Sequence, residues 1–103
     1  MNASYILELI KQNEEIILSI PSTIQRMEKV IEITKNAPIP PGIPNGLEFI
    51  ETLNVESQFL LHALEMYKTS GRVILIPNSF SKAESKQVTA ALDYIYELCE
   101  KND

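Results

Sequence analysis

The chain has 103 residues, of which 45% are hydrophobic and 22% charged, a balance that fits one globular domain and not a disordered chain. Its net charge of −5 argues against a nucleic-acid binder, because such domains carry a basic patch for phosphate contacts. No apolar run approaches the roughly 18–20 residues of a membrane span, and residues 1–15 lack the basic start of a signal peptide. The single cysteine, Cys99, excludes an intramolecular disulfide, so we expect the reducing environment of the cytoplasm. The length predicts one domain over residues 1–103.

A heptad-like stripe of isoleucines runs through the first 35 residues and predicts helix with one apolar face. Its positions are Ile10, Ile17, Ile24 and Ile31. Pro21 interrupts the pattern, yet the phase of the stripe continues past it, which favours one long helix over residues 4–35 kinked at Pro21. The alternative is two helices, the second opened by Ser22 and Gln25 in capping-box spacing.

Asn13 interrupts the same stripe between two isoleucines. An asparagine in a coiled-coil core fixes register and oligomeric state at a cost in stability. The alternative is that the stripe ends there and Asn13 faces water. The stripe as a whole predicts a homo-oligomer, a dimer or higher, with these residues at its interface: Ile10, Asn13, Ile17 and Ile24.

Residues 36–46 hold four of the six prolines and two of the three glycines, and they predict a loop inside the domain. Such a loop is either a rigid connector or a polyproline-like ligand for a groove. Because its backbone angles are already restricted, it costs little to order on binding. The expected partner-binding residues are therefore Pro40, Pro41, Ile43 and Pro44.

Residues 47–69 return to helical spacing. Between Phe59 and Tyr67 the apolar residues spread nearly around the helix axis, which predicts the most buried helix of the fold. Asn54 is a candidate cap for a second segment within this helix, and Gly71 is placed to end it.

Residues 72–76 predict one short extended segment in an otherwise helical chain. Buried backbone groups without a hydrogen-bond partner cost about 1–3 kcal/mol each, so a single strand needs a partner. The segment could pair with residues 38–46, or with its own copy in a second molecule about a two-fold axis. The second pairing adds Val73 and Leu75 to the oligomer interface. The remaining alternative is an extended connector between two helices.

The last helix is expected from about residue 82 to residue 100, opened by Ser81 and Glu84 in capping-box spacing. The junction before it resembles an anion site, because free amides and the positive end of the helix dipole meet there. No glycine-rich phosphate-binding motif accompanies it, so plain capping is the competing interpretation. The candidate anion-binding residues are Arg72, Ser79, Ser81 and Lys82.

His62 and Cys99 are the candidates for a base and a nucleophile, but they fall on a polar and an apolar helix face respectively. Acidic residues lack a histidine at ligand spacing. We therefore expect no catalytic residue, no metal and no cofactor.

These patterns predict a mainly α fold, a small bundle of three to four helices with one extended segment at 72–76. The expected function is that of a non-enzymatic, acidic, oligomeric protein that binds or inhibits a partner protein. The alternative function is a small-ligand-binding oligomer that sequesters an anionic metabolite or a nucleotide.

Overall fold

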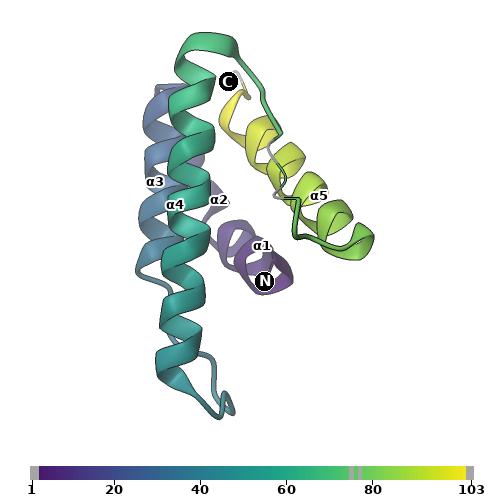
Figure 1. The fold of residues 1–103 in the computed structure, drawn as a ribbon. Coiled ribbons are helices and arrows are strands. Elements are labelled where there is room, and N and C mark those ends of the chain that lie inside the picture. Colours follow the sequence, from purple (N-terminus) through teal and green to yellow (C-terminus); the bar gives the residue numbers. More distant parts are fainter. Residues whose placement is uncertain (1–2, 75, 77, 102–103) are drawn as a thin grey trace.

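The computed structural model describes residues 3–74, 76 and 78–101, and these residues form five helices and no strand (Figure 1). The prediction of a mainly helical chain is thereby confirmed, although with more helices than the three or four expected. The helices are α1 (Ala3–Gln12), α2 (Glu14–Leu18), α3 (Thr23–Lys35), α4 (Gly46–Ser70) and α5 (Lys82–Cys99).

The first 35 residues form three helices instead of the one kinked helix favoured by the phase of the stripe. A break at Asn13 separates α1 from α2, and the chain leaves helical geometry again around Pro21. Ser22 then begins α3, because its hydroxyl accepts a hydrogen bond from the Gln25 backbone N–H at 3.3 Å. The alternative of a helix opened at Ser22 is the one observed, since Pro21 has no amide hydrogen with which to continue α2.

The isoleucine stripe lies in the core of the single chain. Ile10 and Ile17 are both 0% exposed, and Ile24 is half-buried against the same cluster. Asn13 is also half-buried, and its side-chain amide donates to the Leu9 carbonyl at 2.8 Å. Ile10 and Ile17 are therefore core residues of the single chain and not surface residues available to a second copy.

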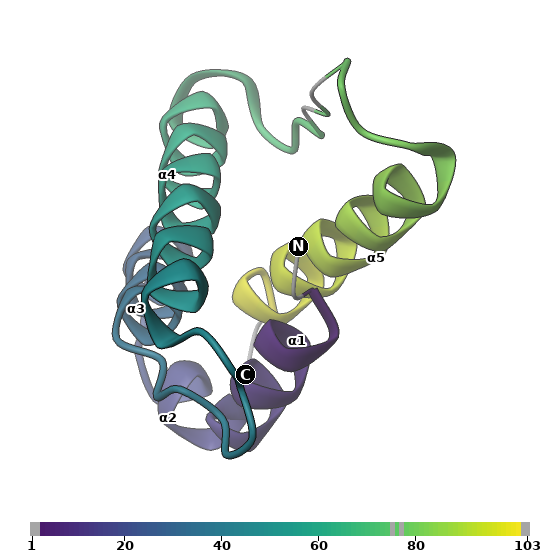
Figure 2. The same cartoon turned by 60° about the horizontal axis from the view of Figure 1, so that its bottom comes forward.

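Helices α3 and α4 lie side by side and antiparallel, whereas α5 packs on α1, α2 and α3 (Figure 1). The backbones of α4 and α5 are not in close contact, and the two helices are inclined to one another in both views (Figures 1 and 2). They approach one another near their C-terminal ends, where the rings of Tyr67 and Tyr96 stack at 5.7 Å between centroids. The bundle is consequently closed at that end and open between the first half of α4 and the start of α5.

Helix α4 is continuous through Asn54, so Asn54 does not cap a second segment. The helix begins at Asn45, whose side-chain oxygen accepts from the Glu48 backbone N–H at 3.2 Å. It ends at Gly71, as the sequence predicted, with φ of 77° at the glycine and its N–H donated to the Tyr67 carbonyl at 3.0 Å. A positive φ of this size favours glycine, which has no Cβ.

The described residues of the 72–76 segment form no strand and run beside α5 as an irregular connector (Figure 1). The hydroxyl of Tyr96 donates to the Val73 carbonyl at 2.7 Å, and the guanidinium of Arg72 lies 5.8 Å from the centre of the Tyr96 ring. The connector is thus fastened to α5 by side chains instead of a backbone ladder. Leu75, the other residue expected at a strand interface, lies outside the described residues.

Candidate functional site

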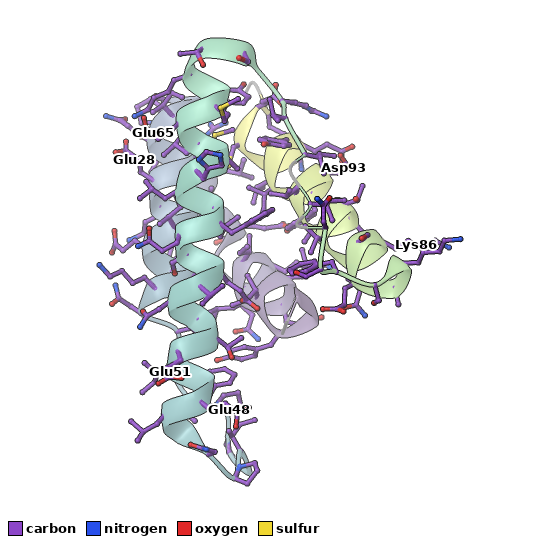
Figure 3. All side chains as sticks on the ribbon, in the orientation of Figure 1. Glu28, Glu48, Glu51, Glu65, Lys86 and Asp93 are labelled. Carbon is purple, nitrogen blue, oxygen red and sulfur yellow. The ribbon has the colours of Figure 1, made fainter. Side chains whose placement is uncertain are left out.

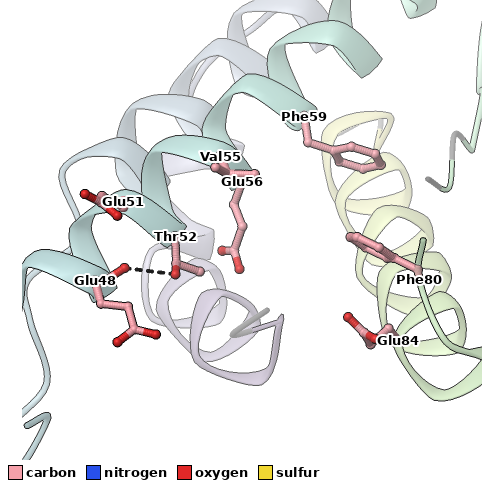
Figure 4. Close-up of a pocket in the computed structure, with 8 residues that line it drawn as sticks. All are labelled: Glu48, Glu51, Thr52, Val55, Glu56, Phe59, Phe80 and Glu84. Carbon is pink, nitrogen blue, oxygen red and sulfur yellow. Dashed lines mark hydrogen bonds between the residues drawn. The ribbon is translucent and has the colours of Figure 1, made fainter. Parts of the chain in front are cut away.

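A cleft of about 410 Å³ lies between the first half of α4 and the segment that leads into α5 (Figure 4). Three apolar side chains, four carboxylates and one threonine line it. The lining residues are Glu48, Glu51, Thr52, Val55, Glu56, Phe59, Phe80 and Glu84.

Helical periodicity brings the α4 side chains to the cleft. Thr52, Val55 and Phe59 are three and four residues apart, so they share one side of the helix. Val55 is 69% exposed although its side chain is apolar. Phe59 and Phe80 face one another across the cleft, and both also pack against the core (Figure 4). The cleft therefore has an accessible apolar surface anchored on the core.

The opposite wall is held in place by the start of α5. The hydroxyl of Ser81 accepts from the Glu84 backbone N–H at 3.2 Å, and the Glu84 carboxylate accepts from the Ser81 backbone N–H at 3.2 Å. This confirms the predicted capping box. The backbone hydrogen bond from Ser81 also lowers the pKa of Glu84, so this carboxylate is ionised at neutral pH.

The cleft is lined by four carboxylates and by no basic residue. Glu48 and Glu51 lie near the N-terminal end of α4, whereas Lys86 points away from the bundle on α5 (Figure 3). Glu56, the third glutamate of α4 in the cleft, is only 4% exposed. Glu84, the fourth glutamate, lies on the opposite wall. Among residues 3–74, 76 and 78–101, no three histidine, cysteine or acidic side chains are grouped closely enough to hold a metal ion.

The Pro-rich loop adjoins one end of this cleft. Ile43 and Pro44 line a smaller hollow of about 180 Å³ that shares two α4 residues with the cleft. Pro41, Ile43 and Pro44 are exposed and Pro40 is half-buried. Two of the four residues expected to bind a partner, Ile43 and Pro44, therefore lie beside the α4 end of the cleft.

The residues predicted for an anion site are not brought together. Arg72 forms an ion pair with Glu100 just after the C-terminal end of α5, whereas Ser81 caps its N-terminal end. An 18-residue helix separates these ends by about 27 Å. Ser79 and Lys82 are exposed beside Ser81, whose hydroxyl already accepts the capping hydrogen bond.

The two side chains suited to nucleophilic chemistry lie in different environments, as their helical faces predicted. His62 is exposed on α4, and Cys99 is fully buried on α5. Burial raises the pKa of the Cys99 thiol to about 12, although the nearby positive charge of Arg26 opposes the shift. The thiol is therefore protonated at neutral pH and is a poor nucleophile.

Sequence reasoning did not find the cleft. Phe59 and Phe80 each carried a local signal, one as part of a buried helix and one beside a capping box, but nothing in the chain links them across 21 residues. Comparison of the chain with family models, with curated proteins and with solved structures found no significant match. Within the part that the structure describes, no helix has the length and apolar character needed to cross a membrane.

Proposed function

We propose that this protein is a non-enzymatic interaction module that uses the cleft to bind or inhibit a partner protein. The observation that supports this most directly is the accessible apolar surface formed by Val55, Phe59 and Phe80. Exposed apolar surface lining a groove is typical of binding sites, because covering it releases water. The Pro-rich loop, with Pro41 and Pro44 exposed, provides further contact area at the end of the groove.

A binding role also fits the chemistry of the side chains. The thiol of Cys99 is buried and protonated, and His62 lies on the exposed side of a different helix. The carboxylates that line the cleft are distributed over two walls and do not converge on one point. This arrangement favours binding of a positively charged partner over catalysis.

We also propose that the chain self-associates through the outward side of α4. Leu47 is 76% exposed, and Ile50 and Leu61 on the same side are also exposed. Large apolar residues at these spacings form a stripe along a helix, and such stripes are covered when two helices pair. This surface replaces Ile10 and Ile17, which are buried in the core, as the proposed contact between copies.

The alternative function, a binder of anionic metabolites or nucleotides, has less support. Arg72 is engaged with Glu100, and the cleft carries carboxylates on both walls, which repel an anionic ligand. Of the four candidate anion-binding residues, Ser79 and Lys82 are exposed near the start of α5.

Quantitative capture of proteins from the native host tests the binding function. The full chain, its Val55→Asp variant and its Ile16→Asp variant serve as bait. Ile16 is the matched control because it is 53% exposed and lies on α2, away from the cleft. We expect at least one protein, recovered from the cytoplasmic fraction, to be captured by the unchanged chain and by Ile16→Asp but lost with Val55→Asp. Identical captured sets from all three baits contradict the proposal.

A further inference from the structure

The cleft has the length and direction of a groove for a helix. Its α4 wall runs from Glu48 to Phe59, and eleven residues at 1.5 Å each extend about 16 Å along the helix axis. Thr52 and Val55 lie between them, one on each successive turn. Three turns of a second helix match this length.

The second wall faces α4 across the cleft. Phe80 and Glu84 lie opposite the α4 lining residues, with the cleft between them (Figure 4). An amphipathic helix that entered this space would place its apolar side against Phe59, Phe80 and Val55. The described chain offers no strand edge that would favour an extended peptide instead.

The charges around the apolar surface specify the polar side of the partner. Glu48 and Glu51 lie along the α4 rim and Glu84 on the opposite rim, and no lining residue is basic. Carboxylates on both rims repel an acidic segment and attract lysine or arginine side chains that extend beyond the apolar contact.

We propose that the cleft binds a basic amphipathic helix of a partner protein, with its apolar residues against Phe59, Phe80 and Val55 and its lysine or arginine residues against the glutamates of the two rims. This inference rests on the proposed function and adds the chemical class and conformation of the partner segment. The recognised pattern is an apolar residue at i, i+3 or i+4, and i+7, surrounded by cationic residues.

A display library of random peptides of about 15 residues, long enough for three to four helical turns, tests the class of partner without assuming its sequence. The library is selected on the full chain and counter-selected on the Val55→Asp variant. We expect the enriched peptides to carry net positive charge and the helical apolar pattern. A synthetic copy should gain helical circular dichroism on binding.

Charge reversal then tests the rims. The synthetic peptide should bind Glu48→Lys/Glu51→Lys about tenfold more weakly at low salt, and the difference should shrink at high salt because salt screens exposed charges. The matched control is Glu15→Lys/Glu28→Lys, which makes the same change in net charge at exposed residues outside the cleft and should bind as the unchanged chain does.

The outcomes separate this inference from the function on which it rests. Cleft-dependent peptides that are neutral, acidic or extended overturn the basic helix and leave the binding function standing. The inference is also overturned if no selected peptide loses binding to the Val55→Asp variant. The protein capture experiment, in which the unchanged chain is compared with Val55→Asp, then decides the binding function separately. A change in oligomeric mass caused by Val55→Asp overturns it too, since the occupant would then be a second copy.

Discussion

At the scale of single residues, Cys99 couples the stability of the fold to pH. Its side chain is fully buried, and burial raises the pKa of the thiol to about 12. The same thiol in an unfolded chain has a pKa of about 8.5. Well below that pH the thiol is protonated in both states, so it contributes nothing to the pH dependence of stability there.

Between about pH 8.5 and pH 12, the unfolded chain releases a proton that the folded chain retains, so the free energy of unfolding falls as pH rises. From pH 8.5 to pH 10 the loss should be about 1.5 kcal/mol. Urea unfolding at pH 7, 8.5 and 10 measures it. Burial also raises the pKa of three tyrosines, Tyr67, Tyr94 and Tyr96. Above about pH 10 these tyrosines therefore lower the free energy of unfolding further.

The control for this prediction is Cys99→Ala. The variant will be less stable at pH 7 because it leaves a cavity, but its stability should change little between pH 8.5 and pH 10. The comparison therefore uses the slope with pH and not the absolute stability. Equal slopes for the two proteins would exclude Cys99 as the titrating group.

Residue-scale features were predicted from the sequence where their cause is local. The capping box of Ser81 and Glu84 and the helix end at Gly71 depend on neighbours within a few positions, and both are present. The burial of Arg26 and Glu56 had no such signal. Whether a charged residue is buried depends on what packs over it, and that is decided by distant parts of the chain.

At the scale of helices, Arg26 joins three elements through their carbonyl oxygens. It lies on α3 and is 4% exposed. Its guanidinium donates to Leu18 at 3.0 Å and to Ile20 at 2.7 Å, at the end of α2 and just beyond. It also donates to Cys99 at 3.2 Å and to Lys101, at the end of α5 and just beyond. Carbonyls at helix ends lack partners within the helix, and the negative end of the dipole favours a cation.

Replacing Arg26 with alanine should therefore separate these helix ends. We expect the free energy of unfolding to fall by about 3 kcal/mol, because buried carbonyls lose charged hydrogen bonds. Arg26→Lys should recover less than half of this loss, since one ammonium group cannot reach carbonyls in several directions. Urea unfolding at neutral pH measures both variants.

The matched control is Lys29→Ala on the same helix. Lys29 forms a surface ion pair with Glu32 at 3.2 Å, and such pairs contribute less than about 0.5 kcal/mol. A loss for Arg26→Ala as small as that of the control would show that the guanidinium does not hold the helices together.

Helix boundaries also show where sequence reasoning was limited. The phase of the isoleucine stripe favoured one helix through Pro21, because periodicity reports which side residues face and not whether the backbone is continuous. The same isoleucines occupy one face of three short helices, and the break at Pro21 follows from its missing amide hydrogen. The alternative prediction, a helix that Ser22 opens, depended on local hydrogen bonding. It described the start of α3 better than the phase of the stripe did.

At the scale of the whole molecule, the mainly helical fold could be predicted and the cleft could not. Helical periodicity and caps are repeated along the chain, whereas the cleft arises from the angle between α4 and α5. That angle depends on how the side chains of α1 and α3 fill the space between them. A single sequence contains no direct signal for it.

Self-association is the remaining prediction at this scale, and it depends on the outward side of α4. Leu47 and Leu61 each lie seven residues from Asn54, and all three are exposed on that side. Two α4 helices that pair antiparallel about a two-fold axis through Asn54 place Leu47 of one copy against Leu61 of the other. Each leucine is then covered, and the two Asn54 side chains meet and can hydrogen-bond at the axis.

Light scattering after size exclusion measures this directly. We expect a mass about twice 11.7 kDa at micromolar concentration, and Leu47→Glu or Leu61→Glu should reduce it to the mass of one chain, since each substitution buries an unpaired carboxylate in the pairing surface. Val55→Glu is the matched control, because Val55 is also an exposed apolar residue of α4 but belongs to the cleft. The mass of this variant should stay that of the unchanged protein. A single-chain mass for the unchanged protein contradicts self-association. An equal effect of all three substitutions would instead place the contact between copies across the cleft.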